Sequence, residues 1–205
     1  MRMLLIGGEG QLGSDILRNN TCHQILAPTH AKLDVQLREN VESFVHQFSP
    51  EIIVNCAAFH NVPNCEFAPE LAFRINCIAV RDLAEICRKL DIPLVTFSSD
   101  YVFGGDQRKP YGEASCPAPV QVYGMTRLAG EHAARALAPN HAVIVRTCGL
   151  YGMAVSRSKG GNFVDQRIAE ARVNEQIEIS CEQIVSPTSS DDLSKAVLGL
   201  IEHSE

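Results

Sequence analysis

The chain has 205 residues, enough for one substantial hydrophobic core, and carries a net charge of −6 with a pI near 5.6. Its basic residues are scattered, so the sequence gives no indication of a nucleic-acid interface. No apolar run reaches the length of a membrane span, and the N-terminus lacks the basic and apolar regions of a signal peptide. We therefore expect a cytoplasmic protein that contacts neither nucleic acid nor a membrane.

The eight cysteines are spread singly, with no Cys-x-x-Cys pair and no histidine at the spacing of a metal ligand. In a reducing cytoplasm such cysteines are most simply small buried apolar residues. The sequence therefore predicts neither a disulfide framework nor a metal site.

The first elements surround a glycine-rich turn. Residues 3–6 predict a short apolar strand, residues 14–18 have a helix-like pattern, and Gly7-Gly8-Glu9-Gly10-Gln11-Leu12-Gly13 lies between them. The glycines at 7, 10 and 13 allow a tight turn and close backbone approach to a pyrophosphate, and the helix N-terminus offers unpaired N–H groups to phosphates. This context predicts dinucleotide binding.

Strand-like and helix-like patterns then alternate along the chain. Strands are expected at 24–27, 51–56, 94–98 and 142–146, and helices at 38–48, 70–90, 123–137, 163–173 and 190–202. This alternation predicts an α/β fold with a doubly wound parallel sheet (Rossmann fold) and ligands at the carboxyl ends of the strands. We expect a dinucleotide-binding domain over 1–150 and a partial substrate-binding lobe, interleaved with the core, over 151–205. Residues 151–162 predict a mobile loop.

Tyr123 and Arg127 stand four positions apart in the predicted helix 123–137, so their side chains share one face. A phenol beside a fixed positive charge can give or take a proton, because the charge favours the phenolate. A Tyr–Arg pair alone is more often an ordinary helix surface. Combined with the glycine-rich turn, the pair becomes a candidate catalytic site.

Five motifs in order carry a resemblance to a known family. They are Gly-Gly-x-Gly-Gln-Leu-Gly at 7–13, Asn-x-Ala-Ala at 55–58, Ser-Ser-Asp-Tyr-Val-Phe at 98–103, Tyr-Gly-x-x-Arg-Leu-Ala-Gly-Glu at 123–131 and Arg-Thr-x-x-x-Tyr-Gly at 146–152. Together they resemble the extended short-chain dehydrogenase/reductases and are most similar to the dTDP-4-dehydrorhamnose reductase group. Residues 160–164 and 186–188 also match later motifs of that group, so the resemblance covers nearly the whole chain.

The resemblance implies a nicotinamide cofactor and a role for each matched residue. The residues implied to hold its pyrophosphate are Gly7, Gly10, Gln11, Leu12 and Gly13, with Asp34 and Val35 bordering the adenine and Ala57 and Ala58 lining the route to the nicotinamide ribose. Ser99 would hydrogen-bond to the reacting carbonyl oxygen, and Tyr123 would pass it a proton beside Arg127. The alternative for Ser99, less favoured given the matching residues around it, is a strand-end hydroxyl bonded to nearby backbone. Tyr101 and Phe103 are expected to be packing residues.

Three positions depart from the family pattern. Arg127 replaces the family's lysine, keeping the charge but not the ability to release a proton. His60 stands where the family has threonine, and Gly149 stands where it has tryptophan. The last change removes an apolar wall from the sugar site.

The end of the second expected strand bears on cofactor choice. A carboxylate there would bind the ribose 2′-hydroxyl and repel a 2′-phosphate, and none is present. Thr29, His30 and Lys32 could receive a phosphate, which favours NADP over NAD; the alternative is that they are solvated turn residues.

Two functions remain open. The first is a reductase that transfers hydride from NADP (or NAD) to the keto group of a nucleotide-linked 4-keto-6-deoxy sugar, with Ser99, Tyr123 and Arg127 as site residues. The second is a catalytically weakened, dinucleotide-binding regulatory subunit of the same family. We expect a nucleotide-sugar ligand, and either a homodimer or a complex with a partner enzyme subunit.

Overall fold

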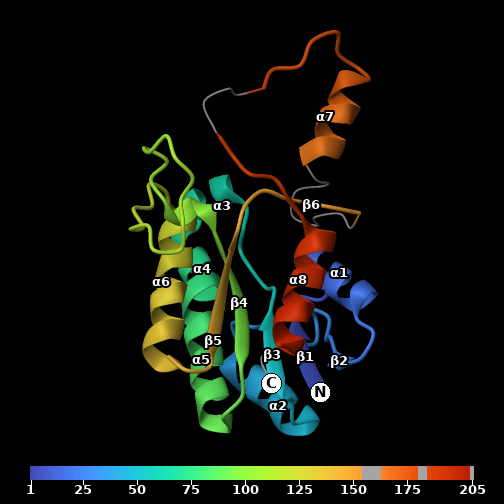
Figure 1. Cartoon of the computed structure of the whole chain (residues 1–205), viewed down its shortest axis with the longest axis vertical. Helices are drawn as coiled ribbons and strands as arrows, with labels where there is room; N and C mark the ends of the chain where they lie inside the picture. The colour runs from blue at the N-terminus through green and yellow to red at the C-terminus, as the bar shows by residue number, and fades with distance from the viewer. Residues whose placement is uncertain (154–162, 180–183, 204–205) are drawn as a thin grey trace. The chain divides into compact units, whose positions relative to one another are not determined.

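Five parallel strands form the central sheet, in the order β2-β1-β3-β4-β5 (Figure 1). They are β1 (Arg2–Ile6), β2 (Gln24–Leu26), β3 (Ile52–Asn55), β4 (Leu94–Ser99) and β5 (Ala142–Thr147). The four residues of β3 and all six of β4 are buried, as expected for the central strands of a parallel sheet. The predicted α/β fold of the Rossmann type is confirmed.

The computed structural model describes residues 1–153, 163–179 and 184–203. Its backbone forms two compact units, one of residues 1–7 and 22–147 and one of residues 8–21 and 148–205. The first unit contains the whole five-stranded sheet. Within the described residues, no helix has the length and apolarity needed to cross a bilayer.

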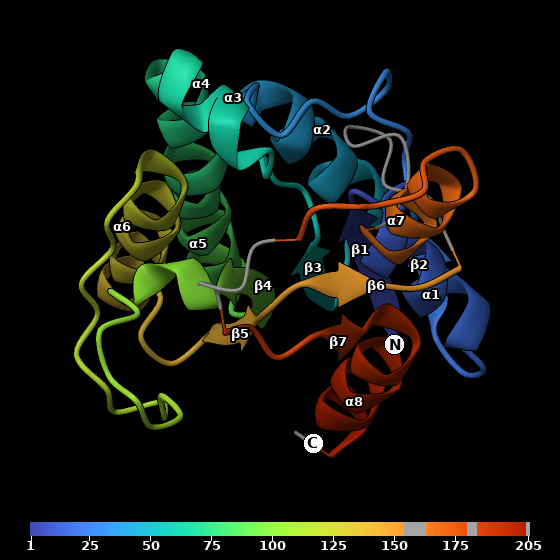
Figure 2. The same ribbon diagram turned by 90° about the horizontal axis from the view of Figure 1, so that it is seen from above.

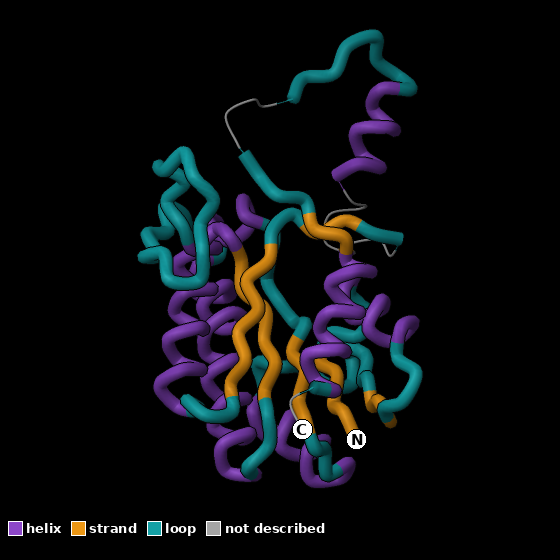
Figure 3. Tube along the Cα trace, viewed as in Figure 1, coloured by secondary structure: helices purple, strands orange, loops and turns teal. Residues whose placement is uncertain are grey.

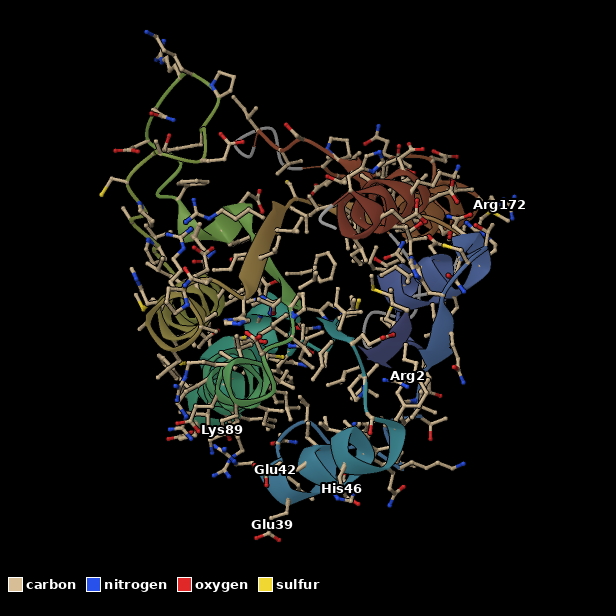
Figure 4. All side chains as sticks on the ribbon, turned by 60° about the horizontal axis from the view of Figure 1, so that its bottom comes forward. Arg2, Glu39, Glu42, His46, Lys89 and Arg172 are labelled. Carbon is tan, nitrogen blue, oxygen red and sulfur yellow. The ribbon has the colours of Figure 1, made fainter. Side chains whose placement is uncertain are left out.

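Helices of the first unit pack on one face of the sheet. Figure 2 shows α5 (Ala79–Leu90) beside α6 (Val122–Leu137), and these two helices are in contact. Their apolar residues join those of α2 (Arg38–Phe48) over strand residues such as Leu4 and Ile53. The opposite face of α2 carries exposed polar side chains, among them Glu39, Glu42 and His46 (Figure 4). An amphipathic helix on a buried sheet explains this division.

One predicted helix is interrupted. The sequence predicts a single helix over 70–90, whereas the structure has α4 (Pro69–Phe73), a π-helical segment η1 (Arg74–Ile78) and then α5. Asn76 lies in the middle of η1, and its side chain bonds to other elements rather than to solvent. π-Helical turns of this kind occur frequently at functional sites.

Two short elements of the first unit are absent from the predictions. They are α3 (Val62–Phe67) and the 3-10 turn η2 (Asp100–Val102). Helix α3 begins with the Asn61 side chain accepting from the Asn64 N–H and with Pro63 in its first turn. These are ordinary helix-start signals that its brevity conceals.

The second unit joins α1 (Gln11–Asn19) to α8 (Ser190–Glu202), which pack together. The buried Ser190 hydroxyl donates to Asp15 at 2.5 Å, and Arg18 donates to Asp191 at 2.6 Å. This unit also contains α7 (Phe163–Ala171) and a parallel pair of short strands, β6 (Leu150–Tyr151) and β7 (Thr188–Ser189). Residues 154–162 of the expected loop 151–162 lie outside the described residues.

Candidate active site

The predicted contact between Tyr123 and Arg127 is present on α6. The Arg127 Nε–H donates to the Tyr123 hydroxyl at 3.3 Å, and the guanidinium carbon lies 5.5 Å from the centroid of the tyrosine ring. Tyr123 is 8% exposed and Arg127 is 7% exposed. A buried cation therefore lies against a buried phenol.

Arg127 has donors to spare. A guanidinium has five N–H donors, and among the described residues only the Nε–H finds a partner, the Tyr123 hydroxyl. No carboxylate among those residues forms an ion pair with Arg127. Burial raises the pKa of the neighbouring Cys56 thiol to about 12 despite the opposing charge of Arg127, so Cys56 stays neutral. The remaining N–H groups are available to a ligand.

Ser99 closes β4 and is only 6% exposed. Its hydroxyl donates to the Asp100 carboxylate at 2.9 Å and accepts from the Tyr101 N–H at 3.3 Å. The ring of Tyr101 meets the ring of Tyr123 edge-on, with 5.6 Å between the centroids. Tyr101 thus connects the end of β4 to Tyr123, and the Ser99 hydroxyl is engaged with its own turn.

Asn76 is a site residue that the sequence reasoning did not identify. Its amide N–H groups donate to the Phe59 carbonyl at 2.9 Å and to the Thr126 hydroxyl at 3.1 Å, while its oxygen accepts from the Phe59 N–H at 3.0 Å. Thr126 in turn donates to the Tyr123 carbonyl at 2.8 Å. The only available signal was an asparagine in the middle of an otherwise apolar helix face.

The turn after β1 comes very close to the turn after β3. Gly7 has a φ of +79°, and a Cβ there would lie 2.8 Å from the Ala57 nitrogen and 2.9 Å from the Cys56 carbonyl carbon. Only glycine fits such a position. Ala57 is itself held by its N–H, which donates to the Asn55 side chain at 3.1 Å, and both Ala57 and Ala58 are half-buried.

The first turn of α1 is suited to an anion. Gly10 is its N-cap and offers no side-chain cap, and the turn contains no acidic residue. Its N–H groups and the positive end of the helix dipole therefore favour a phosphate. The other predicted phosphate-holding residues, Gln11, Leu12 and Gly13, form this turn.

The segment after β2 has one exposed part and one buried part. Thr29, His30 and Lys32 are exposed and share a turn in which the Thr29 carbonyl accepts from the Lys32 N–H at 2.9 Å. Asp34 accepts from the Gln36 N–H at 2.9 Å, whereas Val35 packs into the main hydrophobic core. The exposed turn is accessible to a charged ligand group.

Two of the departures from the family pattern have a structural context. His60 is half-buried, with its Nδ1 at 3.5 Å from the Ala58 carbonyl oxygen. Gly149 is exposed, has a φ of +34°, and accepts from the Thr188 N–H at 3.2 Å. A side chain at Gly149 would strain the backbone, because a φ of +34° is one that residues other than glycine rarely adopt.

The whole chain, residues 1–205, matches the family model for the RmlD substrate binding domain. It is 35% identical over 204 residues to a dTDP-4-keto-6-deoxy-D-glucose reductase of Streptomyces niveus, covering 98% of this chain and 69% of that protein. It is 34% identical to a dTDP-4-dehydrorhamnose reductase of Sinorhizobium fredii, of which it spans 65% of the length, with 97% of this chain covered.

Solved structures agree with the sequence matches. A dTDP-4-dehydrorhamnose reductase from Bacillus anthracis, in complex with NADP, superposes with a TM-score of 0.91 at 34% identity, covering 98% of this chain and 70% of that one. The orthologous reductase from Clostridium acetobutylicum gives a TM-score of 0.91 at 32% identity and covers 99% and 71%. The chain belongs to the RmlD substrate-binding-domain family of extended short-chain dehydrogenase/reductases.

Proposed function

We propose that the chain is an NADPH-dependent reductase that acts on the keto group of a nucleotide-linked 4-keto-6-deoxy sugar. The observation that carries this proposal is the buried Tyr123–Arg127 pair on α6. The names of the relatives, reductases of dTDP-linked sugars, support the substrate class. The chain spans 65% of the length of one of these relatives and 69% of the other.

The residues present fit a dinucleotide. Gly7 has no side chain, so a pyrophosphate can approach the backbone of the turn closely. The first turn of α1 has no side-chain cap and offers its N–H groups to the pyrophosphate. Ala57 and Ala58 would adjoin the nicotinamide ribose, and Asp34 and Val35 the adenine. The exposed Thr29, His30 and Lys32 support a 2′-phosphate, hence NADP, and the B. anthracis relative was crystallised with NADP.

In this mechanism a bound nicotinamide supplies hydride to the carbonyl carbon of the sugar. Tyr123 donates its phenolic proton to the carbonyl oxygen, and Arg127 stabilises the phenolate that remains. The unpaired N–H donors of Arg127 would bind hydroxyl groups of the ligands, the task of the lysine in related enzymes. Ser99 can donate to the carbonyl oxygen only after its hydroxyl leaves Asp100.

The second candidate is a dinucleotide-binding regulatory subunit that does not turn over. It is favoured by Arg127, by Gly149, and by the engagement of the Ser99 hydroxyl with Asp100. In either case we propose a substrate-binding lobe within 151–205, a cytoplasmic location, and assembly as a homodimer or with a partner enzyme subunit. Light scattering on the purified chain, alone and mixed with candidate subunits, tests the assembly.

The deciding experiment is NADPH oxidation with a panel of nucleotide 4-keto sugars. Tyr123→Phe should lower turnover by a factor of about 10² to 10⁴, the range of general acid catalysis. Arg127→Lys should preserve or raise it, whereas Arg88→Lys, the same change on the exposed side of α5, should leave it unchanged.

The outcomes separate the two candidates. Turnover that survives Tyr123→Phe rules out the proposed mechanism. NADPH binding without turnover by the parent or any variant supports the regulatory subunit instead.

A further inference from the structure

Arg146, at the end of β5, forms a two-pronged ion pair with Glu131 of α6. Its Nε–H donates to one carboxylate oxygen at 2.8 Å and its Nη2–H to the other at 2.6 Å. The Glu131 side chain is 2% exposed and that of Arg146 17%. This fork geometry fixes the plane of the guanidinium, because both prongs must be satisfied at once.

The guanidinium of Arg146 also lies over an aromatic ring. Its central carbon is 5.1 Å from the centroid of the Phe103 ring, which stacks on Tyr111 at 4.4 Å with an interplanar angle of 12°. The Tyr111 hydroxyl donates to Asp106 at 3.0 Å. We call the four side chains Glu131, Arg146, Phe103 and Tyr111 the Arg146 stack.

The Arg146 stack holds a long loop. Residues 104–120 contain neither helix nor strand, and in Figure 3 this loop lies next to the carboxyl ends of β4 and β5. Loops of this length are uncommon in compact domains and are usually either functional or disordered linkers, and this one is held in place by the Arg146 stack. The Ala118 N–H donates to the Val102 carbonyl at 2.9 Å, so the two ends of the loop meet.

Both ends of the loop lead directly into the candidate site. At one end Phe103 follows Tyr101, whose ring touches Tyr123; at the other, Gln121 is the N-cap of α6, the helix that carries Tyr123. Gly124 packs so tightly on the Tyr101 carbonyl that a Cβ there would clash with it. A shift of the loop would therefore move Tyr101 against Tyr123.

We propose that the Arg146 stack positions the 104–120 loop for the reaction: Arg146, held by Glu131, fixes Phe103 and Tyr111, and the stack so places the loop and Tyr101 for binding of the sugar nucleotide. This proposal deepens the proposed function and rests on it. In this proposal Arg146 acts on the substrate only through these side chains. None of the predicted cofactor residues lies within the 104–120 loop, so NADPH binding should not depend on it.

The test uses Phe103→Leu, which removes the ring between Arg146 and Tyr111 but keeps an apolar side chain and leaves the Glu131–Arg146 ion pair intact. Phe67→Leu, the same change at a side chain 87% exposed on α3, is the matched control. For the parent and both variants we would measure hydrogen exchange of the loop amides and calorimetric Kd values for NADPH and for a dTDP-linked sugar. The KM and kcat for reduction of that sugar complete the set.

For Phe103→Leu we expect the exchange rate of the Ala118 amide to rise about tenfold, and the KM for the dTDP-linked sugar to rise by the same factor. A tenfold change corresponds to the loss of one aromatic stacking contact and one cation–π contact. The Kd for NADPH should match the parent, and Phe67→Leu should match it in every measurement. Exchange like the parent's, or faster exchange with unchanged KM and kcat, would overturn the positioning role.

A failure of the proposed function can be distinguished from a failure of the positioning role. If the parent reduces no 4-keto sugar, the Kd of the dTDP-linked sugar becomes the readout. A rise in that Kd for Phe103→Leu alone supports the positioning role, and equal Kd values, or no binding by the parent, refute it.

Discussion

The side-chain amide of Asn76 donates to the Thr126 hydroxyl at 3.1 Å, which joins the π-helical segment η1 to the helix that carries Tyr123. The same amide group also makes two bonds to the Phe59 backbone, just beyond Ala57 and Ala58. One side chain, 1% exposed, therefore ties the turn after β3 to α6.

Removal of this side chain should be costly. Asn76→Ala removes the hydrogen bonds of the amide to the Phe59 N–H, the Phe59 carbonyl and the Thr126 hydroxyl. It should lower the free energy of unfolding by about 2–4 kcal/mol. Thr126→Val keeps the side-chain shape and the Phe59 bonds, so about 1 kcal/mol is expected. Urea unfolding followed by far-UV circular dichroism gives both values, and equal losses would contradict a central role for Asn76.

Two helix glycines should respond in opposite directions to alanine. A Cβ at Gly130 of α6 would clash with the Asn76 carbonyl oxygen, so Gly130→Ala should force α6 away from η1 and lower the free energy of unfolding by about 1–3 kcal/mol. A Cβ at Gly199 of α8 meets nothing within 4 Å, so Gly199→Ala should raise it by about 0.5–1 kcal/mol. Thermal unfolding of the two variants measures the contrast; a stabilising Gly130→Ala would show that this helix contact is looser than described.

The Glu131–Arg146 ion pair should make stability depend on pH. Burial alone would raise the pKa of Glu131, but the hydrogen bonds of Arg146 and Ser98 and the charges of Arg146 and Arg135 together outweigh it, so its pKa in the folded chain lies below the usual 4.5. Its stabilising contribution is therefore fully present above about pH 4.5 and is lost as the pH falls through the folded pKa.

Glu131→Gln tests this dependence. At neutral pH it should lower the free energy of unfolding by about 3 kcal/mol, because Arg146 keeps a buried charge without its counterion. The gap between parent and variant should narrow as the pH is lowered below the usual pKa of Glu131. Glu39→Gln, on the exposed face of α2, should cost less than about 0.5 kcal/mol at any pH, and a Glu131→Gln gap that is constant with pH would rule out the ion pair as its cause.

Cofactor binding should require a bare backbone at the start of α1. Gly10→Val places a branched side chain at the N-cap where phosphate must approach, so calorimetric titration with NADPH should give no measurable heat. Far-UV circular dichroism of the variant should match the parent. An NADPH affinity equal to that of the parent would show that the pyrophosphate does not bind at this turn.

Much of the fold could be predicted from the sequence because local patterns and burial agree there. The helices expected at 38–48 and 190–202 coincide with α2 and α8 to the residue. The expected strand at 94–98 corresponds to β4, one residue longer. The interruption at η1 was not predicted, because it depends on Asn76 reaching Phe59 and Thr126, which are distant in sequence.

The candidate site was predictable only where spacing alone sets the geometry. Tyr123 and Arg127 share a helix face by their separation of four residues, and they touch as expected. The engagement of Ser99 with Asp100 depends on a hydroxyl rotamer, which no sequence pattern specifies. The same holds for the Arg146 stack, whose members come from three separate segments of the chain.

The place of β5 in the sheet has a consequence for handling the protein. β5 pairs with β4 along one side, and no other described strand pairs with it. It begins Ala142-Val143-Ile144-Val145, an uncharged run rich in β-branched residues, and Val143 is 37% exposed. Such an edge is a template for strand pairing between molecules. Concentrated solutions should self-associate along β5, and Val143→Lys is the substitution of choice for keeping the purified chain dispersed.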